Sequence, residues 1–512
     1  MQNLTDAPPA RVQPAPPAPV RDGATGRYLL WLILATTAIR LAFAASTGLG
    51  VDESYMISAG RVLSLGYFDH PPAAWWLSWG AAHLFGSEAP VVVRLPFIAL
   101  FALSTWLMAR LGAAVAGPRA GLWAAVLVNL SPVFGITTAT WVLPDGPLDC
   151  ALLGAALCML HALPAGGRAA WGWWATAGLC AGLAMFSKYS AGLTVLGAGL
   201  YLLASAPHRH WLARPQPYLA GVVALLVFSP VLVWNATHHW ASFAFQGDRA
   251  EGLRFHPFAS FGVLAGEALF VLPWIWAPMM VAWIAALRRG SADWRRWLLC
   301  WLGMPPIVLF AAIAVWSSQR VLFHWAAPGY LMLFPLLGEA VALRIGHPVV
   351  RRILIGTAAL AVGALVVIGT QLSLGWLEPV VMAFARHDPT VEGIDWSSVR
   401  ADLAARGLLH SGTVVGVPNW RDAGKIAYAL GPEVTVLCLN RDSRQFGFAH
   451  PAAAYLGHDV LVLAPEHRER VPAELGADFR ALRRLPDAPI THAGDVLQWV
   501  GVYQGDDLRA AP

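Results

Sequence analysis

Charged residues are scarce in this chain of 512 residues. Asp, Glu, Lys and Arg together make up 13% of it, whereas hydrophobic residues make up 57%. In typical soluble domains about 25% of the residues are charged. The deficit argues against a soluble globular protein and predicts a polytopic α-helical membrane protein. The 25 Trp residues agree with this class, because indole rings collect at the two membrane–water interfaces.

Cysteine is also rare, and the common nucleotide-binding motifs are missing. Four of the five Cys residues lie inside apolar runs, so we predict neither a disulfide framework nor a CxxC metal site. The chain has no Walker or GxGxxG loop, which leaves nucleotide-driven transport and a soluble-type sugar-nucleotide site without support. A formal net charge of +5 is too small to indicate nucleic acid as a partner.

Long apolar runs are abundant instead. A helix needs about 17 to 25 mostly apolar residues to cross a bilayer, and runs near this length recur, so we predict about 11 to 13 transmembrane helices. The runs are Tyr28–Ser46, Val91–Val115, Gly121–Leu143, Leu148–Leu163, Trp171–Ser187, Ala191–Ala206, Tyr218–Trp234, Phe261–Leu287, Trp297–Val315, His324–Leu343 and Ile353–Trp376. The shorter, Trp-rich run Ala73–Phe85 predicts an interfacial or re-entrant helix.

The two ends of the chain differ from this apolar middle. Residues 1–26 are rich in Pro and Ala, which predicts a disordered cytoplasmic tail, and we assign residues 27–376 to the transmembrane domain. Residues 377–512 are of mixed composition and predict a small soluble α/β domain. Its β-like runs are 413–418, 433–439, 459–465 and 496–503, with a helical run at 421–430.

The positions of Lys and Arg predict the orientation. With the N-terminal tail in the cytoplasm, every strongly basic short loop falls on the cytoplasmic side, as expected for inner-membrane proteins. The acidic loops and the C-terminal domain then fall on the opposite side. We therefore expect the chemistry of the protein on its extracytoplasmic face.

One such loop, Val51–Pro72, combines Asp52 and Glu53 with a second polar pair, Asp69 and His70. A solvated loop is the ordinary explanation for an isolated acidic pair. Two acidic clusters in one short connection, ahead of a stiff Pro-Pro re-entry into the membrane, favour an active-site loop instead.

Asp145, Lys188 and Tyr189 are further candidates. Asp145 lies between two prolines in LPDGPLD, where it is either functional or a turn and helix-cap residue. Lys188 and Tyr189 stand between two apolar runs in FSKYSAG. The lysine either extends to the interface without further function or binds a lipid phosphate as a point charge.

The predicted outer loops contribute a last group of candidates. The adjacent His238 and His239 are potential metal ligands, although their spacing matches no closed zinc pattern and interfacial packing is the more common explanation for such histidines. Arg249, Arg320 and His324 lie in the same loops.

These motifs, in order, resemble a known family. DESY, GYFDHPP, LPDGPL, SKYSAG, NATHHWASFAFQGDR and FHWAAPGYL follow one another as in the bacterial branch of the family 39 and family 83 glycosyltransferases. These are relatives of dolichyl-phosphate-mannose protein mannosyltransferases and of the lipid A aminoarabinose transferase. The resemblance implies a GT-C fold, an active site on the non-cytoplasmic face, and a polyprenyl-phosphate-linked sugar as donor.

The resemblance also implies roles for the candidates. Asp52 matches the catalytic acid/base residue, Glu53 and Tyr55 its support, and Lys188 the contact to the lipid phosphate. The expected sites are catalytic Asp52, Glu53 and Asp145; substrate-binding Tyr55, Lys188, Tyr189, Arg249, Arg320 and His324; and metal-binding Asp69, Asp145, His238 and His239. In the family, a later His is the third ligand of a divalent metal, and the corresponding region of this chain reads AFQGDRAEG. Only Gln246, or His238 and His239 at a displaced position, could then provide the third ligand.

The expected function is sugar transfer at the outer face of a bacterial inner membrane, with inversion at the anomeric carbon. The expected partners are the polyprenyl-phosphate sugar, membrane lipids, and an acceptor that is lipid A or lipopolysaccharide, another glycolipid or glycan, or a protein. A transporter or flippase of lipid-linked saccharides is the alternative, and it would carry ionisable residues in mid-span positions or paired broken helices.

Overall fold

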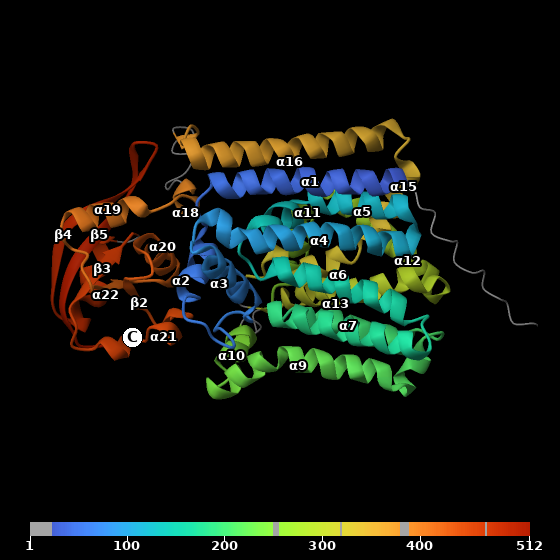
Figure 1. Ribbon diagram of the computed structural model, residues 1–512, viewed down its shortest axis with the longest axis horizontal. Helices are drawn as coiled ribbons and strands as arrows, with labels where there is room; N and C mark the ends of the chain where they lie inside the picture. The colour runs from blue at the N-terminus through green and yellow to red at the C-terminus, as the bar shows by residue number, and fades with distance from the viewer. Residues whose placement is uncertain (1–22, 249–254, 318–319, 379–388, 466–467, 512) are drawn as a thin grey trace, which may run out of the picture.

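The computed structural model describes residues 23–248, 255–317, 320–378, 389–465 and 468–511. Figure 1 shows two stacked parts, a body of long, roughly parallel helices and a smaller domain of helices and strands at one end of it. We call the end of the body that meets this domain the domain-facing end.

Helix α1 (Gly23–Ser46) begins at the opposite end of the body and runs to the domain-facing end (Figure 1). It starts inside the segment that we predicted as a tail. The rest of that segment, residues 1–22, lies outside the described residues.

The helical body continues with a series of apolar helices and short connections. Its further helices are α2 (Val51–Ala59), α3 (Ala73–Phe85), α4 (Pro90–Ala116), α5 (Pro118–Leu130), α6 (Asp145–Ala162), α7 (Gly167–Ser187), α8 (Ala191–Ala204), α9 (Pro215–Thr237), α10 (Ala241–Asp248), α11 (Ala259–Val271), α12 (Pro273–Arg289), α13 (Trp294–Ile313), α14 (Ala327–Leu331), α15 (Phe334–Arg344) and α16 (Pro348–Leu374). Between them lie a π-helical segment, η1 (Val133–Thr138), and the 3-10 segments η2 (Arg209–Ala213), η3 (Gly290–Asp293) and η4 (Phe323–Ala326).

Several of these helices are long and apolar enough to cross a membrane. Among the described residues there are five such stretches, or six if the bent pair of η4–α14 and α15 counts as one span. The five are α1, α4, α9, Pro273–Ile313 and α16. Other predicted spans form shorter apolar helices, such as α8 and α11. The protein is thus a multi-pass membrane protein, whereas the number of 11 to 13 spans stays a prediction.

Three spans that we predicted as continuous are interrupted. The run Phe261–Leu287 breaks at Leu272, whose φ is 82°, because the following Pro273 lacks an N–H and disfavours the α conformation before it. The run Gly121–Leu143 gives way to η1 after Pro132, and the run His324–Leu343 bends by 63°. The η1 break leads directly to the loop in front of Asp145.

The C-terminal domain is a small α/β unit, as predicted. Its helices are α18 (Thr390–Gly393), α19 (Ser397–Ala405), α20 (Trp420–Leu430), α21 (Phe446–Ala449) and α22 (Val471–Leu475), with 3-10 segments η5 (Ala452–Tyr455), η6 (Arg468–Arg470) and η7 (Gly476–Asp478). Its strands are β1 (Val414–Val417), β2 (Thr435–Cys438), β3 (Val460–Ala464), β4 (Phe479–His492) and β5 (Asp495–Leu508).

The strands form one mixed sheet in the order β2-β1-β3-β5-β4. Strand β1 is parallel to β2 and β3, and the antiparallel hairpin β4–β5 extends the sheet through β5. Four strands and α20 lie where the sequence predicts them, but β4 was not predicted. Its sequence contains two Pro and three Arg without a clear alternation, a composition that an edge strand tolerates because one side of it needs no ladder partner.

One apolar core joins the two parts. Tyr55 and Trp75, from α2 and α3, belong to the same buried cluster as Val415 and Ile426, from β1 and α20. A second large cluster fills the helical body. Because the first core is shared, the C-terminal domain is packed onto the domain-facing end and is not loosely tethered to it.

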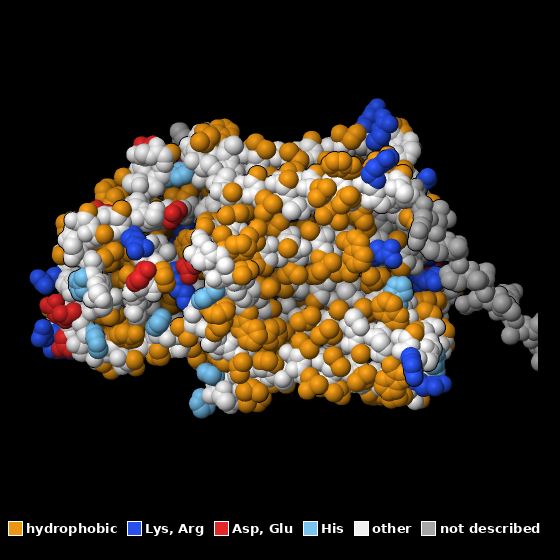
Figure 2. Space-filling model, in the orientation of Figure 1, with side chains coloured by type: hydrophobic (Ala, Val, Ile, Leu, Met, Phe, Trp, Pro, Cys, Tyr) orange, Lys and Arg blue, Asp and Glu red, His pale blue; other side chains and the backbone are white. Residues whose placement is uncertain are grey.

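Charge is distributed unevenly along the molecule. Figure 2 shows a largely hydrophobic flank on the helical body, with Lys and Arg side chains gathered at the end far from the C-terminal domain. Acidic side chains on this face lie mainly over the C-terminal domain and its junction with the body (Figure 2).

Candidate active site

The segment Val51–Pro72 lies between the helical body and the C-terminal domain. Its first part is α2, which packs against α3 and against α20 of the C-terminal domain. The start of α2 is closed by Glu53, whose Oε2 accepts a hydrogen bond of 2.9 Å from the backbone N–H of Gly50. This hydrogen bond satisfies an otherwise unpaired amide at the helix start.

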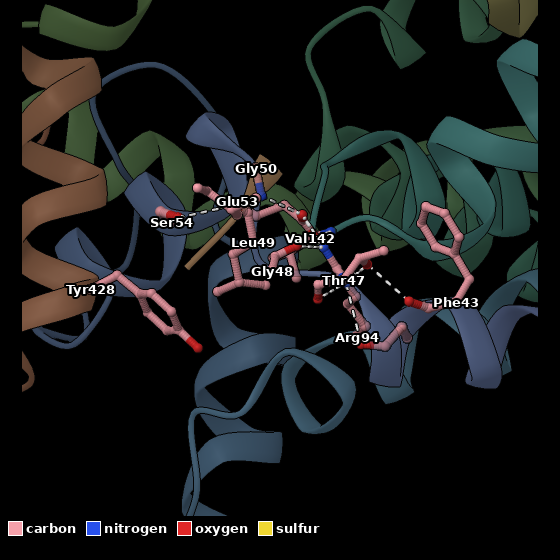
Figure 3. A network of polar contacts seen from close by, with 12 residues as sticks. Phe43, Thr47, Gly48, Leu49, Gly50, Glu53, Ser54, Arg94, Val142 and Tyr428 are labelled. Carbon is pink, nitrogen blue, oxygen red and sulfur yellow. Dashed lines mark hydrogen bonds and ion pairs between the residues drawn. The ribbon is translucent and has the colours of Figure 1, made fainter. Parts of the chain in front are cut away.

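Glu53 forms a buried ion pair with Arg94 of α4 (Figure 3). The Arg94 Nε and Nη2 atoms donate to the two carboxylate oxygens over 2.8 and 2.6 Å, and the backbone N–H of Val142 donates over 3.0 Å. Burial acts to raise the pKa of Glu53, but Arg94 and these hydrogen bonds outweigh it and hold the pKa below its usual value. Arg94 also donates to the carbonyl oxygens of Thr47 and Gly48. This geometry favours a structural role for Glu53.

Asp52, in contrast, is exposed. Among the described residues it has no hydrogen-bond or ion-pair partner. The surrounding protein nevertheless desolvates its carboxylate and raises its pKa, an effect that Glu53 and Glu392 reinforce and that Arg421 and Arg444 oppose. Three of these charges belong to the C-terminal domain. An accessible, unengaged carboxylate with a raised pKa is suited to accept a proton from a substrate.

Asp69 is buried, with 4% of its surface exposed, and contacts several parts of the molecule. Its Oδ1 accepts a hydrogen bond of 3.2 Å from the Tyr55 hydroxyl, its Oδ2 lies 3.5 Å from Nη1 of Arg444, and its carbonyl oxygen accepts one of 2.6 Å from Gln246. Burial raises the pKa of Asp69 to about 6, although Arg444 opposes the shift. Through these contacts Asp69 connects its loop to α2, to α10 and to the C-terminal domain.

Asp145 and Lys188 form a second charged pair. The Lys188 Nζ atom donates to both carboxylate oxygens of Asp145 at 2.9 Å, and both side chains are about one tenth exposed. His70 and His324 are close enough to Asp145 to interact with it electrostatically. The predicted phosphate ligand and the predicted acid are therefore partners, and His70 of the first loop interacts electrostatically with the acid.

The remaining candidates are spread around these two groups. The Tyr189 hydroxyl is 2.7 Å from the Ser242 hydroxyl. His238 stacks on Trp234, with ring centroids 4.3 Å apart, and Arg320 is exposed with its guanidinium over the ring of Phe323. His239 is exposed, and Arg249 lies outside the described residues.

The candidate metal ligands do not assemble into a metal site. Within the described part of the chain there is no group of three or more His, Cys, Asp or Glu side chains that could hold a metal ion. Asp69 is engaged by Tyr55 and Arg444, Asp145 by Lys188, and a ring nitrogen of His238 lies 2.8 Å from the carbonyl oxygen of Trp234. The described residues at these positions do not fit a bound cation.

Two residues of this region were missed by sequence reasoning. Arg94 interrupts the apolar run VVVRLPFIAL, and an ionisable residue in such a run signals a buried partner, so it could have been found. Arg444 carries no comparable signal, because it belongs to the C-terminal domain and reaches Asp69 only through the packing of the two parts.

The comparisons with known proteins agree with this architecture. A family model described as dolichyl-phosphate-mannose-protein mannosyltransferase matches residues 69–234. The lipid A galacturonosyltransferase RgtD of Rhizobium johnstonii is 26% identical over 316 residues, which cover 59% of this chain and 62% of that protein. The chain therefore matches under two thirds of the length of this curated relative.

Solved structures of other proteins have a fold similar to that of this chain. Crystal structures of ArnT from Cupriavidus metallidurans, in the apo state and bound to undecaprenyl phosphate, superpose with a TM-score of 0.63. Sequence identity is 17% and 16%, and each match covers 94% of this chain and 98% of ArnT. The chain thus has the GT-C fold of a polytopic helical membrane protein with a soluble C-terminal domain, and its resemblance to the family 39 and family 83 glycosyltransferases is confirmed.

Proposed function

We propose that the protein is a membrane glycosyltransferase that moves a sugar from a polyprenyl-phosphate donor to a hydroxyl of lipid A or a related envelope glycolipid. The observation that carries this proposal is the state of Asp52, an accessible carboxylate with a raised pKa and no partner among the described residues. Such a group sits at the domain-facing end of the helices, where the headgroup of a membrane-embedded donor is within reach.

The reaction is a single displacement. The acceptor hydroxyl oxygen forms a bond to the anomeric carbon while the bond from that carbon to the phosphate oxygen breaks, and the polyprenyl phosphate leaves with the electron pair. Asp52 takes the hydroxyl proton, a role that contributes about 10²- to 10⁴-fold to a rate. Because attack occurs opposite the leaving group, the anomeric configuration inverts.

Lys188 is the cation that we assign to the donor phosphate. It is held by Asp145, which fixes its position before the donor binds. A phosphate arriving from the membrane competes with Asp145 for the ammonium, and the negative charge that grows on the leaving phosphate strengthens this contact during the reaction. Tyr189 follows Lys188 in the chain, and we assign it to the same donor-binding surface.

The orientation follows from the charge distribution. Lys and Arg side chains gather at the end of the body away from the C-terminal domain (Figure 2), which supports a cytoplasmic location of that end. We propose that the protein resides in a bacterial inner membrane, with Asp52 and the C-terminal domain on the extracytoplasmic side.

The alternative, a flippase of lipid-linked saccharides, would carry broken helices, and three predicted spans are interrupted here, but the comparisons do not favour it. The family model and the curated relative are described as sugar transferases, and the accessible group best suited to chemistry lies at a helix start outside the spans. We therefore retain the transferase.

The test is transfer by purified protein in detergent. Polyprenyl-phosphate galacturonic acid, chosen because of the curated relative, and polyprenyl-phosphate mannose serve as donor probes, with lipid A as acceptor. We expect Asp52→Asn to reduce transfer by about 10²- to 10⁴-fold at unchanged expression. Asp495→Asn, at an exposed position of the C-terminal domain, is the control and keeps wild-type transfer. Full activity of Asp52→Asn would refute the assignment of the base.

A further inference from the structure

Arg444 has an unusual backbone for its residue type. Its φ is 50°, in the left-handed region, where a non-Gly residue is uncommon and carries a steric cost. Such a residue persists when its surroundings over-determine its conformation, and residues of this kind cluster at functional sites. The contacts of the Arg444 side chain show what holds it.

The guanidinium of Arg444 contacts two aromatic rings from different parts of the molecule. Its central carbon is 4.4 Å from the ring centroid of Trp420 in α20 and 4.7 Å from that of Phe245 in α10. Its Nε donates to Asp442 over 3.0 Å, and its Nη1 is 3.5 Å from Oδ2 of Asp69. These two cation–π contacts and the contact to Asp442 restrict the guanidinium while its Nη1 atom lies near Asp69.

The next residue, Gln445, reinforces this arrangement. Its backbone N–H donates to the Tyr55 hydroxyl over 2.9 Å, and its side-chain oxygen accepts a hydrogen bond of 3.0 Å from the backbone N–H of Phe68. Gln445 is 2% exposed. The Arg444–Gln445 pair thus contacts both the residue before Asp69 and the tyrosine that binds Asp69.

Asp69 is the residue that links the two groups of candidate side chains. It interacts electrostatically with Asp52 and with Tyr189, which is next to Lys188. Its neighbour His70 interacts electrostatically with Asp145, the partner of Lys188. A rotation of this loop would therefore change the geometry of both groups at once.

We infer that Arg444 of the C-terminal domain is a positioning residue of the proposed transferase site, which holds Asp69 and the loop around it in the geometry that transfer requires. The inference rests on the proposed function and assigns a role to the C-terminal domain, which completes the site through Arg444. Arg444 acts through Asp69 and does not itself touch the reacting atoms.

The test compares Arg444→Ala, Arg444→Gly and Arg444→Lys in the full-length protein. The glycine variant removes the guanidinium and relieves the left-handed backbone, so it separates loss of the side chain from loss of folding. Arg441→Ala is the matched control, because Arg441 lies in the same segment and is exposed. The same two donor probes and lipid A are used.

We expect kcat of the alanine and glycine variants to fall by about 10²-fold, the size of effect that small misplacements produce, while KM for the donor changes less, because Asp145 still holds Lys188. The lysine variant retains a cation for Asp69 and recovers part of kcat. Arg441→Ala behaves as the wild type. Wild-type kcat in both Arg444→Ala and Arg444→Gly would overturn the inference, and so would equal losses in Arg444→Gly and Arg441→Ala.

A second readout does not depend on catalysis. Hydrogen exchange of residues 64–72 should become faster in Arg444→Gly than in Arg441→Ala, since the loop loses a tie to the C-terminal domain. Unchanged exchange would overturn the positioning role even if no probe were transferred. If Asp52→Asn abolishes transfer while Arg444→Gly keeps it, the proposed function stands and this inference fails.

Discussion

Asp52 and Glu53 are neighbours in the chain with opposite surroundings. Successive residues of a helix point about 100° apart, so α2 directs Glu53 toward Arg94 and leaves Asp52 at the surface. Arg94 and the hydrogen bonds lower the pKa of Glu53 despite its burial, whereas desolvation without a partner raises the pKa of Asp52. Two acids that look equivalent in the motif DESY thus separate into a structural and a chemically available group.

The first residue-level prediction concerns this structural role. Glu53→Gln leaves Arg94 buried without its counter-charge, which should cost about 3 to 5 kcal/mol of folding free energy. The midpoint of thermal unfolding, followed by Trp fluorescence in detergent, measures the loss.

Glu88→Gln is the matched control, because the Arg61–Glu88 pair is more accessible, with 27% of the Glu88 side chain exposed. A more exposed pair should contribute about 1 kcal/mol or less. Equal shifts of the two midpoints would contradict the structural role of Glu53, and loss of transfer without loss of stability would return it to the catalytic group.

At the scale of elements, the contact between α2 and α20 determines the position of Asp52. Gly424 of α20 lies against the backbone of Tyr55, where an added Cβ would come within 2.7 Å of the Tyr55 Cα. The Ser58 hydroxyl donates to the Gly424 carbonyl over 3.2 Å, and the Lys425 ammonium donates to the Leu49 carbonyl over 2.8 Å. The helix of the C-terminal domain and the helix that carries Asp52 therefore move together.

Gly424→Ala tests this contact. The added methyl group meets backbone atoms, which cannot rotate away, so the helices must separate at an expected cost of about 1 to 3 kcal/mol, and transfer should fall because Asp52 shifts with α2. Thermal unfolding and the transfer assay measure both effects.

Gly80→Ala in α3 serves as the control, since no atom lies within 4 Å of its added Cβ. It should leave stability unchanged or slightly increased, because alanine is the better helix former. A neutral Gly424→Ala would show that the two helices tolerate separation.

At the scale of the whole molecule, the two parts are joined by a shared core, and charge is distributed unevenly along the helical body. The core that contains Tyr55 and Trp75 is completed by residues of the C-terminal domain. The basic side chains gather at the other end of the helices (Figure 2). This polarity is the physical basis for the orientation that we propose.

Labelling of single cysteines tests the orientation. In spheroplasts, a membrane-impermeant maleimide should label Asp495→Cys, in the C-terminal domain, and should label Arg351→Cys, in the first turn of α16, only after lysis. Both positions are exposed. Four of the five native Cys are buried and one is partly buried, so the unsubstituted protein gives the background. The reverse labelling pattern would invert the topology and remove Asp52 from the outer face.

The sequence by itself determined the class of protein and most of the regular structure. Apolar runs are local signals, and so are the short strands β1, β2, β3 and β5 and the amphipathic α20, so they were predicted near their observed positions. The ordered motifs also carried the resemblance to a glycosyltransferase fold. The edge strand β4 and the break at Leu272 were missed, because edge position and helix interruption depend on neighbours as well as on local composition.

Only the tertiary structure decided how the candidate residues are combined. Asp69 and Arg444 are 375 positions apart, and Glu53 pairs with an arginine on another helix, so no local pattern foretells either contact. The same packing joined Asp145 to Lys188, and among the described residues it forms no group of three or more His, Cys, Asp or Glu side chains that could hold a metal ion. An acidic side chain can act as a base, form a structural ion pair or connect several elements. Which of these roles it has depends on its desolvation and on the nearest charges, and the tertiary packing sets both.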